Sequence, residues 1–230
     1  MKKLLIIALA AVAVVSCTFT FSSRLIRGNG VEASKEFDLK PISAIVIAGS
    51  LDVVYSQGPQ RITLVADENL LDIYSIEESA GVLHVSIKPG YSIMTKVDNV
   101  IRVSSEDLSS VKIAGSGDFD LKGKLHTDGD FVFAVNGSGD IEAQSIVCKN
   151  FAAKVNGSGD IECGNLTAEK VIANINGSGD ILLRLADSGD VNAHINGSGD
   201  VTLAGNARSI DFKVNGSGDM HTAGLRLSGE

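Results

Sequence analysis

The chain lacks tryptophan and is poor in aromatic residues, which make up 5% of its 230 residues. A core of large aromatic rings is therefore excluded, and the interior must be thin and filled by Val, Ile, Leu and Ala. The chain has only three cysteines, too few for the dense disulfide framework of small secreted domains. Beyond the N-terminal apolar run there is no long segment of helical periodicity, which argues against an α-helical fold.

Basic residues are also scarce: 20 Lys and Arg stand against 28 Asp and Glu, a net charge of −8. An acidic protein repels nucleic acids and anionic membrane surfaces. The sequence has no basic patch interleaved with aromatic residues, so we expect no nucleic-acid partner. Phosphate-binding loops, redox motifs and zinc-ligand spacings are absent as well.

The N-terminus has the pattern of a bacterial lipoprotein signal. Lys2 and Lys3 precede the apolar run Leu4–Val15, and Val14-Val15-Ser16-Cys17 matches a lipobox. This run is short for a membrane span and sits where a secretory signal belongs. We therefore predict a signal peptide over residues 1–16 and a lipidated Cys17 that begins a flexible tether over residues 17–36. The alternative is an ordinary signal peptide with a chance cysteine.

One four-residue corner, Gly-Ser-Gly-Asp, occurs six times in the second half of the chain. Its first glycines are 22, 20, 20, 20 and 19 residues apart. A constant period near 20 residues is typical of a solenoid, in which each repeat is one coil stacked on the last. The six corners are Gly115–Asp118, Gly137–Asp140, Gly157–Asp160, Gly177–Asp180, Gly197–Asp200 and Gly216–Asp219.

Apolar and polar residues alternate on both sides of each corner, which predicts strands with one face inward. One inward column before the corners comprises Val135, Val155, Ile175, Ile195 and Val214. The sequence therefore predicts an all-β fold, a right-handed parallel β-helix or solenoid with about 20 residues per coil over residues 115–230. The corner glycines indicate either a positive φ or a close backbone approach.

Residues 37–114 are predicted to form a less regular N-terminal β portion that caps the solenoid. Ile45–Tyr55, around Gly49-Ser50-Leu51-Asp52, is typical of a degenerate first coil, and Ser79-Ala80-Gly81 indicates a hairpin. At the other end only Leu225–Leu227 are candidates for a cap. An uncapped coil offers a free strand edge, so we predict self-association through the terminal coil.

Two polar rows are expected to run along the stack. Asparagines that precede the corners should form a hydrogen-bonded amide ladder: Asn136, Asn156, Asn176, Asn196 and Asn215. Corner aspartates should form a carboxylate row: Asp118, Asp140, Asp160, Asp180, Asp200 and Asp219. Neighbouring carboxylates repel, and either backbone N–H groups or a cation such as Ca²⁺ could offset the repulsion. We favour the hydrogen bonds, assign no metal ligands, and keep Ca²⁺ as the one cofactor to test.

Cys148 and Cys163 fall in different columns of the repeat, so stacking does not place them side by side. We expect two buried thiols rather than a disulfide.

The lipoprotein signal, the acidic all-β body and the repeated Val/Ile-Asn-Gly-Ser-Gly-Asp-Ile corner together resemble a known family, the "putative auto-transporter adhesin, head GIN domain" proteins. The similarity runs from about Phe37 to Leu227. It implies a β-helix-like fold at the envelope of a diderm bacterium, and hence an outer-membrane lipoprotein on either the outer or the periplasmic side. It supplies no catalytic residues.

Two classes of function remain for this sequence. The first is a non-catalytic, lipid-anchored envelope protein, an adhesin whose β-face binds a protein or glycan. The second is a carbohydrate-active β-helix enzyme, for which Glu142 and Glu162 are the candidate carboxylates. A calcium-stiffened spacer is a third, weaker alternative. We favour the first class and expect no enzyme, because no unique acid, base or metal cluster stands out from the repeats.

Overall fold

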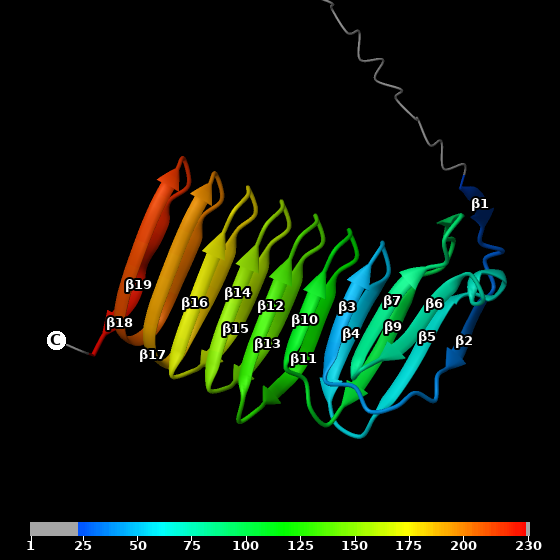
Figure 1. Ribbon diagram of the computed structural model, residues 1–230, viewed down its shortest axis with the longest axis horizontal. Coiled ribbons are helices and arrows are strands. Elements are labelled where there is room, and N and C mark those ends of the chain that lie inside the picture. The colour runs from blue at the N-terminus through cyan, green and yellow to red at the C-terminus, as the bar shows by residue number, and fades with distance from the viewer. Residues whose placement is uncertain (1–22, 229–230) are drawn as a thin grey trace, which may run out of the picture.

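The computed structural model describes residues 23–228, which form two β-sheets stacked face to face along one axis (Figure 1). The chain passes from one sheet to the other at the corners, and neighbouring coils pair in parallel. The predicted all-β solenoid with about 20 residues per coil is thus confirmed. The signal peptide and Cys17 lie outside the described residues. Within residues 23–228 no helix has the length and apolarity needed to cross a bilayer.

The first sheet, sheet I, contains the strands that precede the corners. Its spatial order differs from the chain order at the N-terminal end. The strands are β6 (Tyr74–Ser79), β7 (Val82–Ile87), β3 (Ala44–Ala48), β10 (Ser110–Ile113), β12 (Asp130–Val135), β14 (Asn150–Val155), β16 (Lys170–Ile175) and the second halves of β17 (Ile181–Gly197) and β18 (Val201–Gly216).

The second sheet, sheet II, contains the strands that follow the corners. In spatial order these are β2 (Glu32–Glu36), β5 (Arg61–Asp67), β9 (Val100–Ser105), β4 (Asp52–Gln57), β11 (Phe119–His126), β13 (Ile141–Val147), β15 (Ile161–Thr167), the first halves of β17 and β18, and β19 (Met220–Leu227). A separate pair, β1 (Arg24–Arg27) with β8 (Tyr91–Met94), and a short 3-10 helix η1 (Glu68–Leu70) complete the structure.

Equivalent residues of successive coils lie directly beside one another. Val135 pairs with Val155, which pairs with Ile175, and Ile141 pairs with Ile161. A slip of one residue would turn these apolar side chains to solvent, so the alternating pattern sets the register. The predicted columns are confirmed by this pairing.

Close backbone approach explains the corner glycines. A Cβ atom on Gly137 would overlap the carbonyl oxygen of Gly115 in the preceding coil, and one on Gly139 would overlap that of Gly117. Most corner glycines have no positive φ; Gly216 and Gly49, in the degenerate corner, do. The same overlap recurs from coil to coil, so any larger residue would force the corners apart.

The core is continuous between the sheets, and its aromatic side chains gather near the N-terminal half. Phe131 and Phe133 lie edge to face with ring centroids 4.9 Å apart, and Phe133 meets Phe151 at 5.8 Å. Further along the stack the same column narrows to alanines, Ala153, Ala173 and Ala193. The expected thin aliphatic core thus contains one aromatic section.

The first coils are not stacked in chain order. The degenerate corner Gly49–Asp52 lies directly against Gly115–Asp118, because β3 pairs with β10 and β4 with β11. However, β7 and β9 pair with the opposite edges of β3 and β4. The coil built from β3 and β4 is therefore sandwiched between two coils that come later in the chain.

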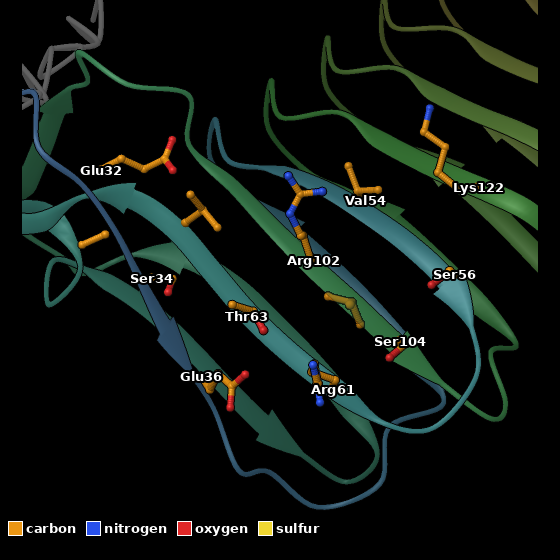
Figure 2. Close-up of a pocket in the computed structure, with 13 residues that line it drawn as sticks. Glu32, Ser34, Glu36, Val54, Ser56, Arg61, Thr63, Arg102, Ser104 and Lys122 are labelled. Atoms are coloured by element: carbon orange, nitrogen blue, oxygen red, sulfur yellow. The ribbon is translucent and has the colours of Figure 1, made fainter.

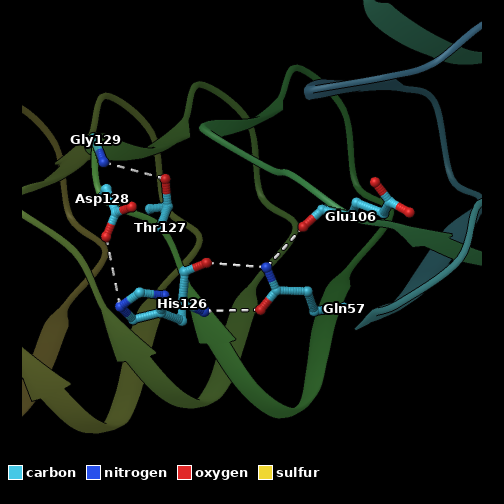
Figure 3. A network of polar contacts seen from close by, with 6 residues as sticks. All are labelled: Gln57, Glu106, His126, Thr127, Asp128 and Gly129. Atoms are coloured by element: carbon cyan, nitrogen blue, oxygen red, sulfur yellow. Dashed lines mark hydrogen bonds and ion pairs between the residues drawn. The ribbon is translucent and has the colours of Figure 1, made fainter.

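Gln57 fastens this inserted coil to its neighbours (Figure 3). Its Nε2 donates to the carbonyl oxygens of Glu106, at 2.7 Å, and His126, at 2.9 Å. Its Oε1 accepts from the backbone N–H of His126 at 2.9 Å. One side chain thereby joins the end of β4 to the β9–β10 connection and to the end of β11.

The prediction of a flexible tether through residue 36 is wrong for residues 24–36. Arg24–Arg27 form β1, and Glu32–Glu36 form β2, which pairs antiparallel with β5. Between them, the backbone N–H of Gly30 donates to the buried carboxylate of Asp67 at 2.6 Å. Burial by itself would raise the pKa of Asp67, but hydrogen bonds from the N–H groups of Lys96, Gly30 and Val97 hold it below its usual value. This long-range anchor has no local sequence signal.

The two ends of the stack differ (Figure 1). At the N-terminal end β2 pairs antiparallel with β5, and β6 pairs antiparallel with β7 in the predicted hairpin. Leu64, Leu70 and Ile76 are buried at this end. At the C-terminal end Leu225–Leu227 do not fold over the last coil. They belong to β19 and pair with β18.

Candidate functional site

The asparagines before the corners form a continuous ladder. The Nδ2 group of each donates to Oδ1 of the asparagine one coil earlier, at 2.8–3.1 Å, from Asn156→Asn136 to Asn215→Asn196. The side chains are exposed at the edge of the stack. Because these amide groups already bond to one another, we interpret the row as a structural element that joins the coils rather than as a ligand-binding site.

The corner aspartates also bond from coil to coil, but through the backbone. Oδ1 of each carboxylate accepts the backbone N–H of the aspartate in the next coil, at 2.7–3.0 Å. The row begins one coil earlier than predicted, at Asp52. These N–H donors offset part of the repulsion between neighbouring carboxylates.

Charge environments differ along the row. Burial raises the pKa of Asp52, although a hydrogen bond from the backbone of Asp118 opposes the shift. The pKa of Asp200 is lowered by hydrogen bonds from the backbone of Asp219 and from His221. Within residues 23–228, no three His, Cys, Asp or Glu side chains gather in a way suited to holding a metal ion.

Of the remaining predicted residues, the cysteines lie in the core, whereas Glu142 and Glu162 line a hollow of about 250 Å³ and Glu142 also lines a neighbouring hollow of about 560 Å³. Cys148 and Cys163 are both buried free thiols, and burial raises the pKa of each to about 12. Glu142 and Glu162 pair in adjoining coils on the exposed outer face of sheet II, beside Asp120 and Lys122. They form part of a repeating outward row.

A larger hollow lies on the outer face of sheet II, near its N-terminal end, with a volume of about 700 Å³ (Figure 2). Strands β2, β5, β9, β4 and β11 form its floor. We call it the sheet II groove. Its lining residues are Glu32, Ala33, Ser34, Glu36, Val54, Ser56, Arg61, Thr63, Val65, Arg102, Val103, Ser104 and Lys122.

The strand register places the polar groups of the groove. Arg102 lies between Thr63 on β5 and Val54 on β4, and Arg61 lies opposite Ser104 on β9. The intervening residues Ile62, Ile101 and Val103 point into the core. Alternation along β5 and β9 therefore sends Arg61, Thr63, Arg102 and Ser104 to the groove face.

Three basic side chains gather in the groove of this acidic protein: Arg61, Arg102 and Lys122. Lys122 forms an ion pair with Asp120. Within residues 23–228 neither Arg61 nor Arg102 has a carboxylate partner within salt-bridge distance. Both guanidinium groups are free to form paired hydrogen bonds with an anionic group.

Two carboxylates, Glu32 and Glu36, also line the groove, and the surface becomes mainly acidic on the far side of Arg102. A second hollow of about 560 Å³ adjoins the sheet II groove there, and carboxylates line it, among them Asp52, Asp98, Asp118 and Asp140. Arg102 lines both hollows. The outer face thus has a groove of mixed charge, in which the three basic side chains gather, and an acidic hollow, and the two meet at Arg102.

Sequence reasoning missed the sheet II groove because its strands come from separate parts of the chain. One signal was present in the register. One outward row is acidic in three successive coils, at Asp120, Glu142 and Glu162, whereas Arg102 occupies it at the N-terminal end. A charge of opposite sign at one position of such a row indicates a surface that differs from the rest of the solenoid.

Comparison with known proteins agrees with this architecture. The model of the family described as "Putative auto-transporter adhesin, head GIN domain" matches residues 42–225. The chain belongs to this family. The matched segment of the GIN domain begins just before β3 and ends in β19, so it includes the inserted coil and all six regular corners.

Several solved structures share the fold of this GIN domain. A "putative adhesin" from Bacteroides fragilis is 18% identical, with a TM-score of 0.71 over 85% of this chain and 99% of that one. A "putative adhesin" from Parabacteroides merdae is 23% identical, with a TM-score of 0.70 over 86% and 98%. A "putative lipid binding protein" from Parabacteroides distasonis is 23% identical, with a TM-score of 0.62 over 86% and 99%. No curated protein matches the chain significantly.

Proposed function

We propose that this protein is a non-catalytic, lipid-anchored adhesin of the cell envelope that binds an acidic glycan in the sheet II groove. The observation that carries the proposal is the pair of guanidinium groups, Arg61 and Arg102, which lack carboxylate partners within residues 23–228, in a hollow of an otherwise acidic protein. Membership of a family described as adhesins supports the binding role.

The groove chemistry favours a ligand that carries both hydroxyl and anionic groups. Ser34, Ser56, Thr63 and Ser104 offer hydroxyls that can donate to and accept from a sugar ring. Arginine binds carboxylate or sulfate through two parallel N–H groups. The described lining contains no aromatic ring for stacking, so charge and hydrogen bonds would dominate affinity, and added salt should weaken it.

Calorimetric titration with an acidic oligosaccharide, such as an oligogalacturonate, tests this proposal against a neutral glucan of equal length. Arg102→Gln and Arg61→Gln should each weaken binding by about tenfold or more, since a hydrogen bond to a charged group contributes about 1.5–3 kcal/mol. Arg184→Gln is the matched control, because Arg184 is an exposed arginine on β17 outside the groove. Equal affinity for the neutral glucan, or an equal loss of affinity in the Arg184 variant, would refute binding of an acidic glycan in the sheet II groove.

The anchor is proposed at Cys17, seven residues before β1. An extended chain of this length spans at most about 25 Å, so the lipid would hold the N-terminal end of the solenoid close to the membrane. Cys17→Ser should release the protein from the membrane fraction and abolish labelling by a clickable fatty acid. Labelling that persists in this variant would exclude Cys17 as the anchor.

Protease treatment of intact cells tests the adhesin role separately. An adhesin that faces outward should be cleaved before the cells are broken. A protein that stays intact until lysis would rule out the adhesin, whereas glycan binding by a periplasmic protein would still be measurable in the titration.

A further inference from the structure

The inward column of the last coil is open at the C-terminal end. Phe212 is 52% exposed and Val214 is 36% exposed, whereas Ala193 and Ile195 in the same columns one coil earlier are 3% and 1% exposed. The second half of β18 pairs only with β17 within the described residues, and β19 pairs only with β18. Both sheets therefore end in a strand with one free edge.

The free edge of β18 presents the peptide groups of the inward residues. In earlier coils the carbonyl oxygen of an inward residue accepts from the next coil: Val135 from Asn156 and Val155 from Asn176, each at 2.7 Å. By the same alternation, the peptide groups of Ile210, Phe212 and Val214 point away from β17. Their hydrogen-bonding groups are available to a further strand.

We propose that a second copy of this chain binds this edge, with the two β18 strands antiparallel about a twofold axis at Phe212. In this register Phe212 lies opposite its counterpart, and Ile210 lies opposite the second copy's Val214. All of these are inward residues, so their peptide groups can form the hydrogen-bonded pairs of an antiparallel ladder. The exposed apolar column of each copy is then covered by that of the other, and the core becomes continuous across the axis.

Charge complementarity selects this register. Asp211 and Lys213 flank Phe212 on the outward face. A twofold axis at Phe212 places Asp211 of each copy opposite Lys213 of the other, at a non-hydrogen-bonded pair where side chains approach most closely. An axis at Asp211 would oppose two aspartates, and an axis at Lys213 would oppose two lysines. Registers that pair odd with even positions would mix inward and outward residues.

The opposite end of the molecule does not offer an equivalent surface. There the apolar side chains Leu64 on β5, Leu70 on η1 and Ile76 on β6 are only 0–6% exposed. Pairing of like ends gives a closed dimer, whereas a head-to-tail contact would give a filament. The structure thus favours a dimer joined at its C-terminal ends, with the two sheet II grooves far apart.

Sedimentation velocity of the purified protein over micromolar concentrations tests the dimer, with charge reversals to test the register. Asp211→Lys alone and Lys213→Asp alone place like charges opposite each other twice, and each should raise the dissociation constant by about tenfold or more. The double variant Asp211→Lys/Lys213→Asp should restore it. An equimolar mixture of the two single variants should form a heterodimer, because each supplies the charge that the other lacks.

Lys154→Asp is the matched control, since Lys154 occupies the same outward column as Lys213 in an interior coil. It should leave the dissociation constant unchanged. A wild-type protein that sediments as a monomer at all concentrations would overturn the proposal. A dimer that responds equally to all four variants, or to none, would overturn this register. Circular dichroism of each variant distinguishes loss of the dimer from loss of the fold.

Discussion

Phe133 gives the most direct test of the stacked core. Its side chain is 0% exposed and contacts three aromatic rings in its own and adjoining coils: Phe131 at 4.9 Å, Phe151 at 5.8 Å and Phe119 at 6.0 Å between centroids. Phe133→Ala would leave a cavity and remove all three aromatic contacts. Phe→Ala changes in cores cost about 3–5 kcal/mol, and aromatic pairs add to the effect of burial, so we expect about 4–5 kcal/mol.

Equilibrium urea unfolding of wild type, Phe133→Ala and Phe133→Leu measures this cost. The leucine variant refills part of the cavity and should lose less than half as much as the alanine variant. Since domains of this size are stable by about 5–15 kcal/mol in total, the alanine variant should unfold at a clearly lower urea concentration. A loss below about 1 kcal/mol, the range of ordinary surface substitutions, would show that the coils are not stacked over Phe133.

Four further results are expected. Gly157→Ala should destabilise the protein by about 1–3 kcal/mol in urea unfolding, because its Cβ would overlap the carbonyl oxygen of Gly137. Gly129→Ala should be neutral or slightly stabilising, because its Cβ would lie 3.7 Å from the nearest atom, Oγ1 of Thr127, and equal effects of the two variants would contradict the corner geometry. The Arg208 and Ser209 side chains lower the pKa of Asp190 to about 2, so the stability from this carboxylate is present above its ordinary pKa of 3.8 and lost as pH falls toward 2. Asp190→Asn should therefore flatten the thermal stability profile in that pH window, and an unchanged profile would exclude the ion pair as its source. In a Cys17→Ser chain, Cys148 and Cys163, whose thiols have a pKa raised to about 12 by burial, should react with a thiol reagent only after unfolding; rapid modification of the native protein would mean that the core opens. Millimolar Ca²⁺ should leave the melting temperature unchanged, since backbone hydrogen bonds already offset the charge of the aspartate row, and a rise that EGTA reverses would support the cation instead.

The regular coils could be predicted almost residue by residue. Each column repeats the same kind of side chain, and period-2 alternation decides which face is inward, so Val135, Val155 and Ile175 could only stack on one another. The hairpin around Ser79-Ala80-Gly81 was also predicted, and the structure confirms it: β6 and β7 pair antiparallel, and Ala80 and Gly81 take a positive φ that suits a two-residue turn.

The sheet II groove could not be predicted. It depends on the antiparallel pairing of β2 with β5 and of β5 with β9, strands that come from distant segments of the chain. Nothing local to Arg61 or Arg102 specifies that both face the same hollow. The segment over residues 24–36 was misread as a tether for the same reason, since its partners β8 and β5 lie far along the chain.

The sequence by itself determined the solenoid, its period, its register and the composition of its core, because these follow from a local pattern repeated at a fixed spacing. Only the tertiary structure decided that the coil of β3 and β4 is inserted between two later coils, and that Phe133 is buried while Phe212 in the same column is exposed. The physical reason is that alternation specifies which way a side chain points, whereas the neighbour of each strand is selected by packing and hydrogen bonds over the whole length of the chain.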